Sequence, residues 1–125
     1  MSSKKFSLKS RIKSFRFAFA GIWAMLKNEH NARIHLAAAI MAIIMGVILK
    51  INPIEWSLLI IVIGLVFLTE LLNTAIEKLA DFVEPEWNEV IRKTKNYAAA
   101  AVLISAIISI IVGGLIFIPR VLDLL

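Results

Sequence analysis

Four polar side chains recur at helical spacing directly after an uncharged stretch of the chain. Residues 56–69 carry no charged side chain, and Glu70, Asn73, Glu77 and Asp81 then follow at intervals of three, four and four. At about 100° per residue, a helix would carry all four within an arc of about 80°. Carboxylates that share one face can take a proton from a hydroxyl group or hold a hard divalent cation through oxygen. The spacing therefore predicts a general base, a cation site, or both.

Glu70 is the strongest candidate for the base, because it comes directly after the uncharged stretch. Ionisable groups near a bilayer are costly, and they tend to face a protein interior or a wet cleft. The alternative is a solvated acidic face with Lys78 as counter-charge, which suits Glu77 and Asp81 if they lie beyond the hydrocarbon. Magnesium bound by proteins usually keeps waters and substrate phosphates beside one or two carboxylates, so a second acid is needed. Glu29 in "KNEHNAR" is the one to consider.

The composition places the elements that carry these residues in a membrane. Of the 125 residues 60% are hydrophobic, and the mean hydropathy is +0.86. This is more apolar side chain than a soluble domain of this size can bury. Absence of cysteine excludes disulfides, thiolate metal sites and cysteine nucleophiles. Eight of the fourteen Lys and Arg residues lie between Lys4 and Arg33. This pattern fits an anionic membrane surface better than nucleic acid, so no nucleic acid partner is expected.

The hydrophobic pattern predicts one domain, residues 1–125, made of helices only. Residues 6–27 alternate apolar and basic side chains at spacings near three and four, which predicts an amphipathic helix. It can lie on the membrane surface or pack on a partner helix, and the basic face favours the surface. Three transmembrane helices are expected over residues 33–50, 54–82 (with a cytoplasmic extension) and 97–118. The first is short for a bilayer of about 30 Å, so its flanking basic residues must extend it.

The basic residues also predict the orientation in the membrane. Arg92, Lys93 and Lys95 precede the third span, whereas the other connection offers only Lys50 and the C-terminal tail only Arg120. Because basic loops stay inside, the N-terminus is expected in the cytoplasm and the C-terminus outside. The carboxylates after the second span then face the cytoplasm, on the same side as the first acid in the chain.

Several motifs together resemble the prokaryotic diacylglycerol kinase family, which are small integral-membrane lipid kinases that include the undecaprenol kinases. The specific one is "ELLNTAIEKLAD", and "AGIWA", "NE", "PEWNE" and "KNYAAAAVLI" support it along nearly the whole chain. "RIH" and "AAAAVLI" look more like the undecaprenol kinase branch. The resemblance implies a homotrimeric helical bundle in the bacterial inner membrane, with active sites between protomers at the cytoplasmic face. It also implies transfer of the γ-phosphoryl group of ATP, with Mg²⁺, to the hydroxyl of diacylglycerol or undecaprenol.

The same resemblance assigns roles to individual residues. Glu70 is implied as the catalytic base with Asn73 as its support, and Glu29 with Glu77 as the magnesium ligands. The residues implied to bind nucleotide are Phe17, Glu29, Glu77, Glu86, Trp87, Asn88, Lys95 and Asn96, of which Lys95 meets the phosphates. The residues expected to contact the lipid substrate are Glu70, Trp56 and Ala99. The family usually has aspartate at position 96 and commonly histidine at position 88, so both asparagines are departures.

Elementary chemistry agrees with these roles and leaves two rivals. Phosphoryl transfer needs mainly positioning and charge neutralisation, and no Walker A loop is present. One rival is a non-catalytic membrane subunit or a small proton or cation transporter that uses Glu70. The other is a sensor of anionic lipid that has lost catalysis through Asn88 and Asn96. His35, alone in an apolar run, is read as an interface residue or a bond to a neighbouring helix rather than a proton relay.

Overall fold

The protein is all-helical over the residues that the structure, a computed structural model, describes, which are residues 5–125. The helices are α1 (Leu8–Asn28), α2 (His30–Ile48), α3 (Pro53–Val83) and α4 (Glu89–Leu124). By length and composition α2, α3 and α4 can each cross a membrane. The expected all-α class is therefore confirmed, and three helices are long and apolar enough to be the expected spans. Lys4 of the basic N-terminal run lies outside the described residues.

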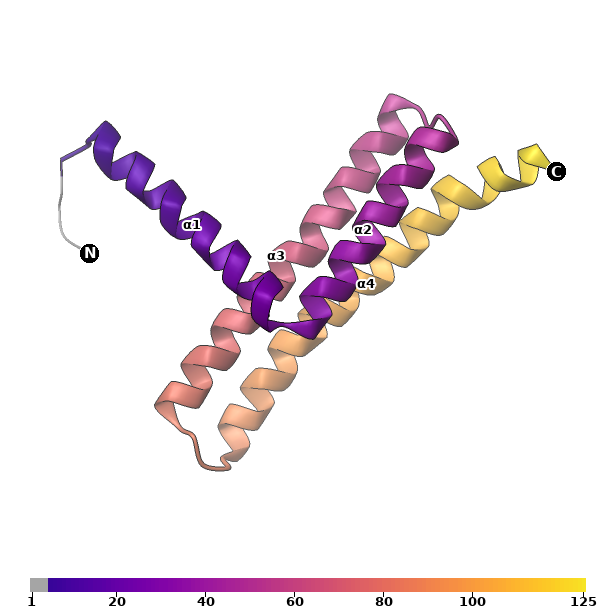
Figure 1. The fold of residues 1–125 in the computed structure, drawn as a ribbon. Helices are drawn as coiled ribbons and strands as arrows, with labels where there is room; N and C mark the ends of the chain where they lie inside the picture. The colour runs from indigo at the N-terminus through magenta and orange to yellow at the C-terminus, as the bar shows by residue number, and fades with distance from the viewer. Residues whose placement is uncertain (1–4) are drawn as a thin grey trace.

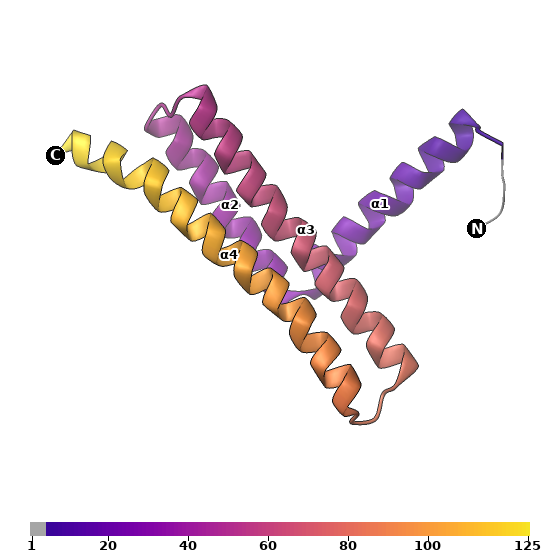
Figure 2. The same cartoon turned by 180° about the vertical axis from the view of Figure 1, so that it is seen from behind.

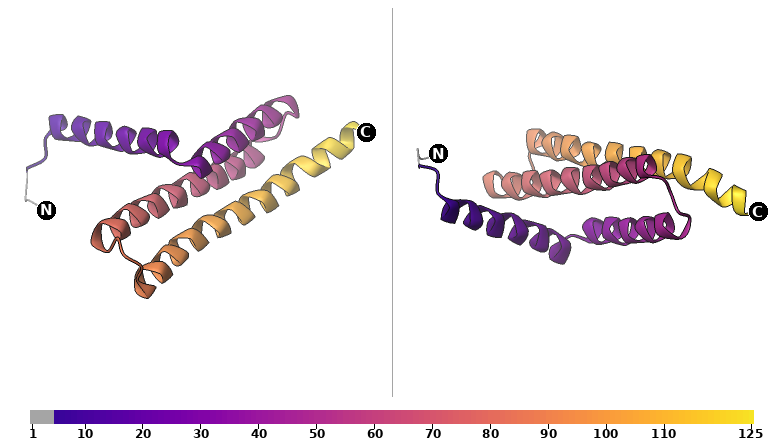
Figure 3. Two further views of the ribbon diagram at one scale, coloured as in Figure 1. Left: turned by 60° about the horizontal axis from the view of Figure 1, so that its bottom comes forward. Right: turned by 90° about the horizontal axis from the view of Figure 1, so that it is seen from above.

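Three of the four helices pack into a bundle, and the N-terminal helix, α1, points away from it. Helices α2, α3 and α4 run side by side, and α1 departs at a sharp angle from the start of α2 (Figures 1 and 2). Seen from above, α3 lies between α2 and α4 (Figure 3). The most extensive packing is between α3 and α4. The second half of α3 and the first half of α4 extend together past the start of α2 (Figure 1). The residues after Glu70 are therefore covered by fewer helices than those before it.

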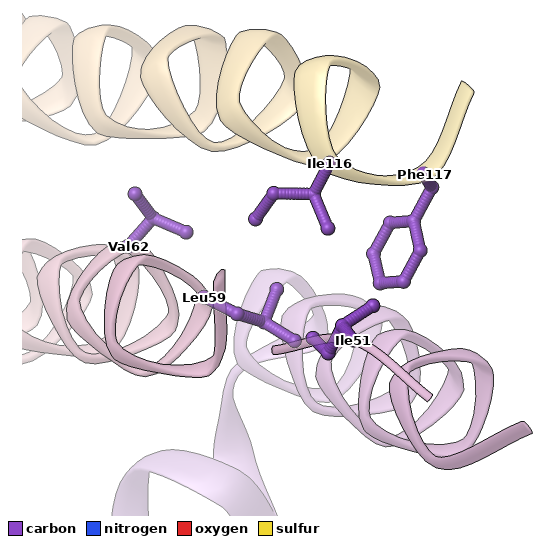
Figure 4. Close-up of a cluster of buried hydrophobic side chains, with 5 residues drawn as sticks. All are labelled: Ile51, Leu59, Val62, Ile116 and Phe117. Atoms are coloured by element: carbon purple, nitrogen blue, oxygen red, sulfur yellow. The ribbon is translucent and has the colours of Figure 1, made fainter. Parts of the chain in front are cut away.

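The buried face of α3 is one continuous stripe that changes from apolar to polar. Its buried residues are Leu59, Val62, Val66, Glu70, Asn73 and Ala80. They recur every three or four positions up to Asn73 and two turns later at Ala80, as expected for one face of a helix. At the apolar end, Leu59 and Val62 meet Ile116 and Phe117 of α4 and Ile51 of the α2–α3 turn (Figure 4). The packing that fixes the rotation of α3 therefore also fixes which way Glu70 points.

The turn between α2 and α3 is a Schellman motif with lysine where glycine is usual. The Ile51 N–H donates to the Gly46 carbonyl at 3.1 Å and the Lys50 N–H to the Val47 carbonyl at 3.3 Å. Lys50 takes a left-handed φ of 54° to close it. Such a conformation places the Cβ of an L-residue too close to the following carbonyl. The turn is thus tight but strained at one position.

We expect Lys50→Gly to stabilise the protein by about 0.5–1 kcal/mol, because glycine has no Cβ to strain this φ. The free energy of unfolding in mixed micelles measures the effect. Lys50→Ala is the matched control, since it removes the charge and the long side chain but keeps the Cβ. Equal stabilisation by both substitutions would contradict the explanation by strain.

The start of α3 is fixed by a capping box and an ion pair. Asn52 Oδ1 accepts from the Glu55 N–H at 2.9 Å, while the Asn52 N–H donates to Glu55 Oε1 at 3.0 Å. Pro53 occupies the first turn, where its missing N–H costs nothing. Glu55 also pairs with Arg120 of α4. This end of the bundle therefore joins α3 firmly to α4.

Helix α4 begins well before the span expected at residue 97. Asn88 caps it by accepting from the N–H groups of Val90 (2.9 Å) and Ile91 (3.2 Å). Glu89 then pairs with Arg92 and Lys93 on the same helix face. The charged segment interpreted as part of a polar connection is thus helical, and only residues 84–88 join α3 to α4. At the other end the helix continues through Pro119.

Candidate active site

Glu70 is almost completely buried at the centre of the molecule. Its exposed fraction is 2%, and its Oε2 atom has no hydrogen-bond partner in the structure. The nearest basic group is Nε2 of His35 on α2, at 3.7 Å from Oε2. Glu29 and Glu77 are close enough to act on Glu70 electrostatically. A buried carboxylate needs partners to offset its lost hydration, so this site is built to interact with something further.

Two more polar groups without partners lie on the next turn of α3. Asn73 is buried and donates from Nδ2 to Glu77 Oε1 at 3.4 Å, but its Oδ1 has no hydrogen-bond partner. The same holds for Oγ1 of Thr74. Buried polar atoms are nearly always hydrogen-bonded in folded proteins. The solvated acidic face that the sequence also allowed does not fit Glu70 and Asn73, since both are buried.

Glu29 supplies the second acid from the junction of α1 and α2. It has an extended backbone, ends α1 and begins α2, and its side chain is half-buried. With Glu77 and the free Asn73 Oδ1 it offers two carboxylates and an amide oxygen, which are ligands suited to a hard divalent cation. Residues 5–125 contain no group of three or more acidic, His or Cys side chains placed to hold a metal. A cation held by Glu29 and Glu77 would therefore need oxygens of water or substrate as its remaining ligands.

The α3–α4 loop brings together four of the eight residues assigned to nucleotide binding, namely Glu86, Trp87, Asn88 and Lys95. A cavity of about 280 Å³ is lined by Asp81, Glu84, Pro85, Glu86, Trp87, Asn88, Ile91, Arg92 and Lys95. Lys95 Nζ lies 2.5 Å from Asp81 Oδ1, and this ion pair keeps the lysine side chain at the wall of the cavity. Asp81 is about 16 Å along α3 from Glu70. Phe17 of α1 and Asn96 are exposed and do not line it.

An apolar cavity of about 270 Å³ runs between α2, α3 and α4, with His35 among its lining residues and Phe117 at the other end of the bundle. Neither Trp56 nor Ala99 lines it. Trp56 packs at the far end of α3, where its ring would lie 2.7 Å from a Cβ at Gly46. Ala99 is exposed on α4. The structure therefore does not gather Trp56 and Ala99 around Glu70.

The sequence interpretation missed a polar contact beside Glu70. Thr69 Oγ1 and Ser105 Oγ share a hydrogen bond of 2.8 Å between α3 and α4, and Ser105 is fully buried. Each hydroxyl also lies within hydrogen-bond distance of carbonyls of its own helix. Because a hydroxyl has one proton, one of the two donates across the helices and the other donates to its own helix. The signal was a pair of serines, Ser105 and Ser109, four residues apart in an uncharged stretch of the chain, together with Thr69 directly before Glu70. This contact ties the backbone of α4 to the residue immediately before the candidate base.

Thr69→Val and Ser105→Ala are each expected to lower the free energy of unfolding by about 0.5–1.5 kcal/mol, the usual range for a hydrogen bond between membrane helices. Ser109→Ala is the matched control, because Ser109 bonds only to the carbonyl of Ala106 on its own helix. The double variant should cost about as much as either single one. Costs that simply add would contradict a shared hydrogen bond.

The chain is similar to known proteins over most of its length. A sequence model of prokaryotic diacylglycerol kinases matches residues 16–117. The chain is 41% identical over 108 residues to the undecaprenol kinase of Bacillus subtilis (strain 168), covering 86% of this chain and 88% of that protein. It is 36% identical over 113 residues to a diacylglycerol kinase of Synechocystis, and the match covers 90% of this chain and 65% of that protein. It is 33% identical over 100 residues to the diacylglycerol kinase of Escherichia coli K12, and the match covers 80% of this chain and 82% of that protein. The resemblance of the motifs is thus confirmed, and the chain belongs to the prokaryotic diacylglycerol kinase family, whose members are phosphotransferases with an alcohol as acceptor.

Proposed function

We propose that this membrane protein transfers the γ-phosphoryl group of ATP to the hydroxyl group of a membrane lipid. The observation that carries the proposal is the buried Glu70 carboxylate with an unpartnered oxygen, at the point where the stripe on α3 turns from apolar to polar. A lipid hydroxyl reaches this depth from the bilayer, and a triphosphate reaches it from water. Membership of a lipid kinase family supports the same conclusion.

Glu70 acts as the general base in this mechanism. Its carboxylate takes the proton as the lipid oxygen forms a bond to the γ-phosphorus and the bond from that phosphorus to the β-phosphate bridging oxygen breaks, releasing ADP. Asn73, one turn further along the same face, orients the reacting groups through its free Oδ1 and its bond to Glu77. Such transfers depend mostly on positioning and on charge stabilisation.

The divalent cation in this proposal is Mg²⁺, held by Glu29 and Glu77. When bound, it would neutralise charge on the phosphate oxygens. Two carboxylates fit this ion, because Mg²⁺ usually keeps waters and substrate phosphates as its remaining ligands. Lys95 adds a positive charge at the loop cavity, where Glu86, Trp87 and Asn88 contact the nucleotide.

Undecaprenol is the acceptor that we place first, with diacylglycerol second. The undecaprenol kinase of Bacillus subtilis shares 41% identity with this chain, against 36% and 33% for the two diacylglycerol kinases compared above. The apolar cavity that starts beside His35 can take part of one hydrocarbon chain, with the hydroxyl end of the lipid near Glu70. Trp56 does not line this cavity, so the expected contact of Trp56 with the lipid would lie outside it.

The assembly and the orientation are part of the same proposal. A homotrimer would offer a partner to the unpaired Oγ1 of Thr74, and native mass spectrometry measures its stoichiometry. Helix α1 would lie on the cytoplasmic surface with its exposed Ile12, Phe15 and Phe19 in the interface and its basic residues at anionic headgroups. The N-terminus would then be cytoplasmic and the C-terminus outside.

One experiment tests the function directly. The protein is reconstituted and incubated with γ-labelled ATP, Mg²⁺ and either undecaprenol or diacylglycerol, and the label on each lipid is measured. Labelled undecaprenol is expected in excess. Labelled diacylglycerol alone would reverse the order of acceptors, and no labelled lipid would overturn the kinase proposal. Ion flux through liposomes without consumption of ATP would support a transporter instead, and lipid binding without transfer would support a sensor.

A further inference from the structure

The only basic side chain of residues 5–125 within ion-pair distance of Glu70 is His35. Nε2 of the imidazole lies 3.7 Å from Oε2 of the carboxylate, and the two side chains are mostly buried, with exposed fractions of 21% and 3%. That same Oε2 atom has no hydrogen-bond partner. The separation is less than 1 Å longer than an N–H···O hydrogen bond of about 2.9 Å. A small side-chain rotation would therefore complete the contact.

The other charges near Glu70 make this contact more important. Glu29 from the α1–α2 junction and Glu77 from α3 both act on it as negative charges. Helix α4 brings no compensation, because residues 98–118 contain no titratable side chain. The carboxylate thus lies among like charges, and the imidazole of His35 is a basic group within ion-pair distance that can donate a hydrogen bond to offset them.

The packing of α2 holds His35 in this position. Ala32 and Ala39, three residues before it and four after it, are buried on the same helix face. Small residues let two membrane helices approach closely, so this face of α2 lies against α3. His30, at the start of the same helix, is exposed and bonded to Arg33. The two histidines of the chain therefore have different surroundings, although they lie five positions apart on one helix.

We propose that His35 is a positioning residue for the base: its Nε2–H donates to Oε2 of Glu70, fixes the carboxylate, and leaves Oε1 to take the proton from the lipid hydroxyl. The inference rests on the proposed function, because it assigns a partner to the base of that reaction. No atom of His35 exchanges a proton in this step. The imidazole acts by holding one carboxylate oxygen and by stabilising its charge.

The kinetic test separates hydrogen bonding from packing. His35→Met keeps the volume but has no donor, and it is expected to lower kcat by about 100-fold, the scale of a 1 Å misplacement of a catalytic group, with the KM for ATP unchanged. His35→Gln places an amide N–H near the position of Nε2, and it should recover at least a tenth of wild-type kcat. His30→Ala is the matched control, with kcat unchanged. Wild-type turnover in His35→Met, or equal loss in both variants at position 35, would overturn the proposal.

A second measurement does not depend on turnover. The ¹⁵N chemical shift of Nε2 of His35 is recorded by NMR in the wild type and in Glu70→Gln, with His30 as internal reference. We expect the His35 signal to move and that of His30 to stay. Unmoved His35 would refute the contact. If the lipid is labelled but the His35 signal does not move, the role of His35 is disproved and the kinase proposal remains. If the His35 signal moves but no lipid is labelled, the kinase proposal is disproved and the contact between His35 and Glu70 remains.

Discussion

Glu70→Gln is expected to remove nearly all phosphoryl transfer while leaving the helical bundle intact. Glutamine has almost the same shape as glutamate but cannot take a proton from the lipid hydroxyl. Losing a general base typically lowers the rate by about 10²–10⁴-fold, so kcat for lipid phosphorylation should fall by that factor. A neutral amide costs less to bury than a carboxylate, and the free energy of unfolding should therefore not decrease.

The measurement is the initial rate of labelled lipid formation in reconstituted membranes, with unfolding in mixed micelles as the check on the fold. Asp123→Asn is the matched control, because Asp123 carries the same charge change at the exposed end of α4. Glu70→Asp keeps the charge but draws the carboxylate back by one methylene, and it should retain intermediate activity. Wild-type turnover in Glu70→Gln would remove Glu70 from the role of base.

Glu29→Gln and Glu77→Gln form the second large effect, on the requirement for Mg²⁺. Each substitution removes one negative ligand charge from the proposed site, and the affinity of a hard cation falls with the number of charged ligands. We expect the Mg²⁺ concentration for half-maximal activity to rise by about tenfold or more in each variant. Titration of activity with Mg²⁺ at fixed ATP measures the change.

Glu89→Gln is the matched control for this titration. Glu89 is exposed, pairs with Arg92 and Lys93 in the first turn of α4 and lies outside the proposed site. Its loss should leave the Mg²⁺ titration unchanged, since exposed ion pairs contribute little. If Glu29 and Glu77 hold one ion, the double variant should lose less than the product of the two single losses. An unchanged Mg²⁺ requirement in both single variants would refute the pair.

The α3 stripe is the part of the site that was readable from the sequence. An uncharged run followed by Glu70, Asn73 and Glu77 at helical spacing predicts one face of one helix, and the structure places the first two of these residues on the buried face. Periodicity is a property of a single segment, so it can be read without knowing which neighbour covers it. That is why the shared face of Glu70 and Asn73 could be predicted from the sequence.

The contacts of that face were not readable, because they come from other helices. His35 has no periodic signal of its own, and its place beside Glu70 depends on how α2 packs on α3. The same is true of the bond between Thr69 and Ser105, which lie 36 residues apart. Lys50 is another example, since lysine gives no sign of the left-handed conformation that closes its turn.

The early start of α4 has a different explanation. Three charged residues close together were interpreted as the end of a polar connection, but Asn88 as N-cap and Glu89 four residues before Lys93 are local signals for a helix. Hydropathy locates the part of a helix that lies in lipid. It does not show where the helix itself begins, and the two boundaries differ wherever a helix extends into water.

The ion pair between Glu55 and Arg120 implies that the activity of the protein should depend on the thickness of the bilayer. Glu70 lies fifteen residues beyond Glu55 on uninterrupted helix, a distance of about 22 Å. The geometry of the α-helix fixes this length, whereas the thickness of the surrounding hydrocarbon varies between membranes. A thicker or thinner bilayer must be met by tilting or by local deformation of the lipid, and either response changes how deep the carboxylate sits. The rate of lipid phosphorylation should therefore peak at one acyl chain length of the host membrane and decline on both sides of it.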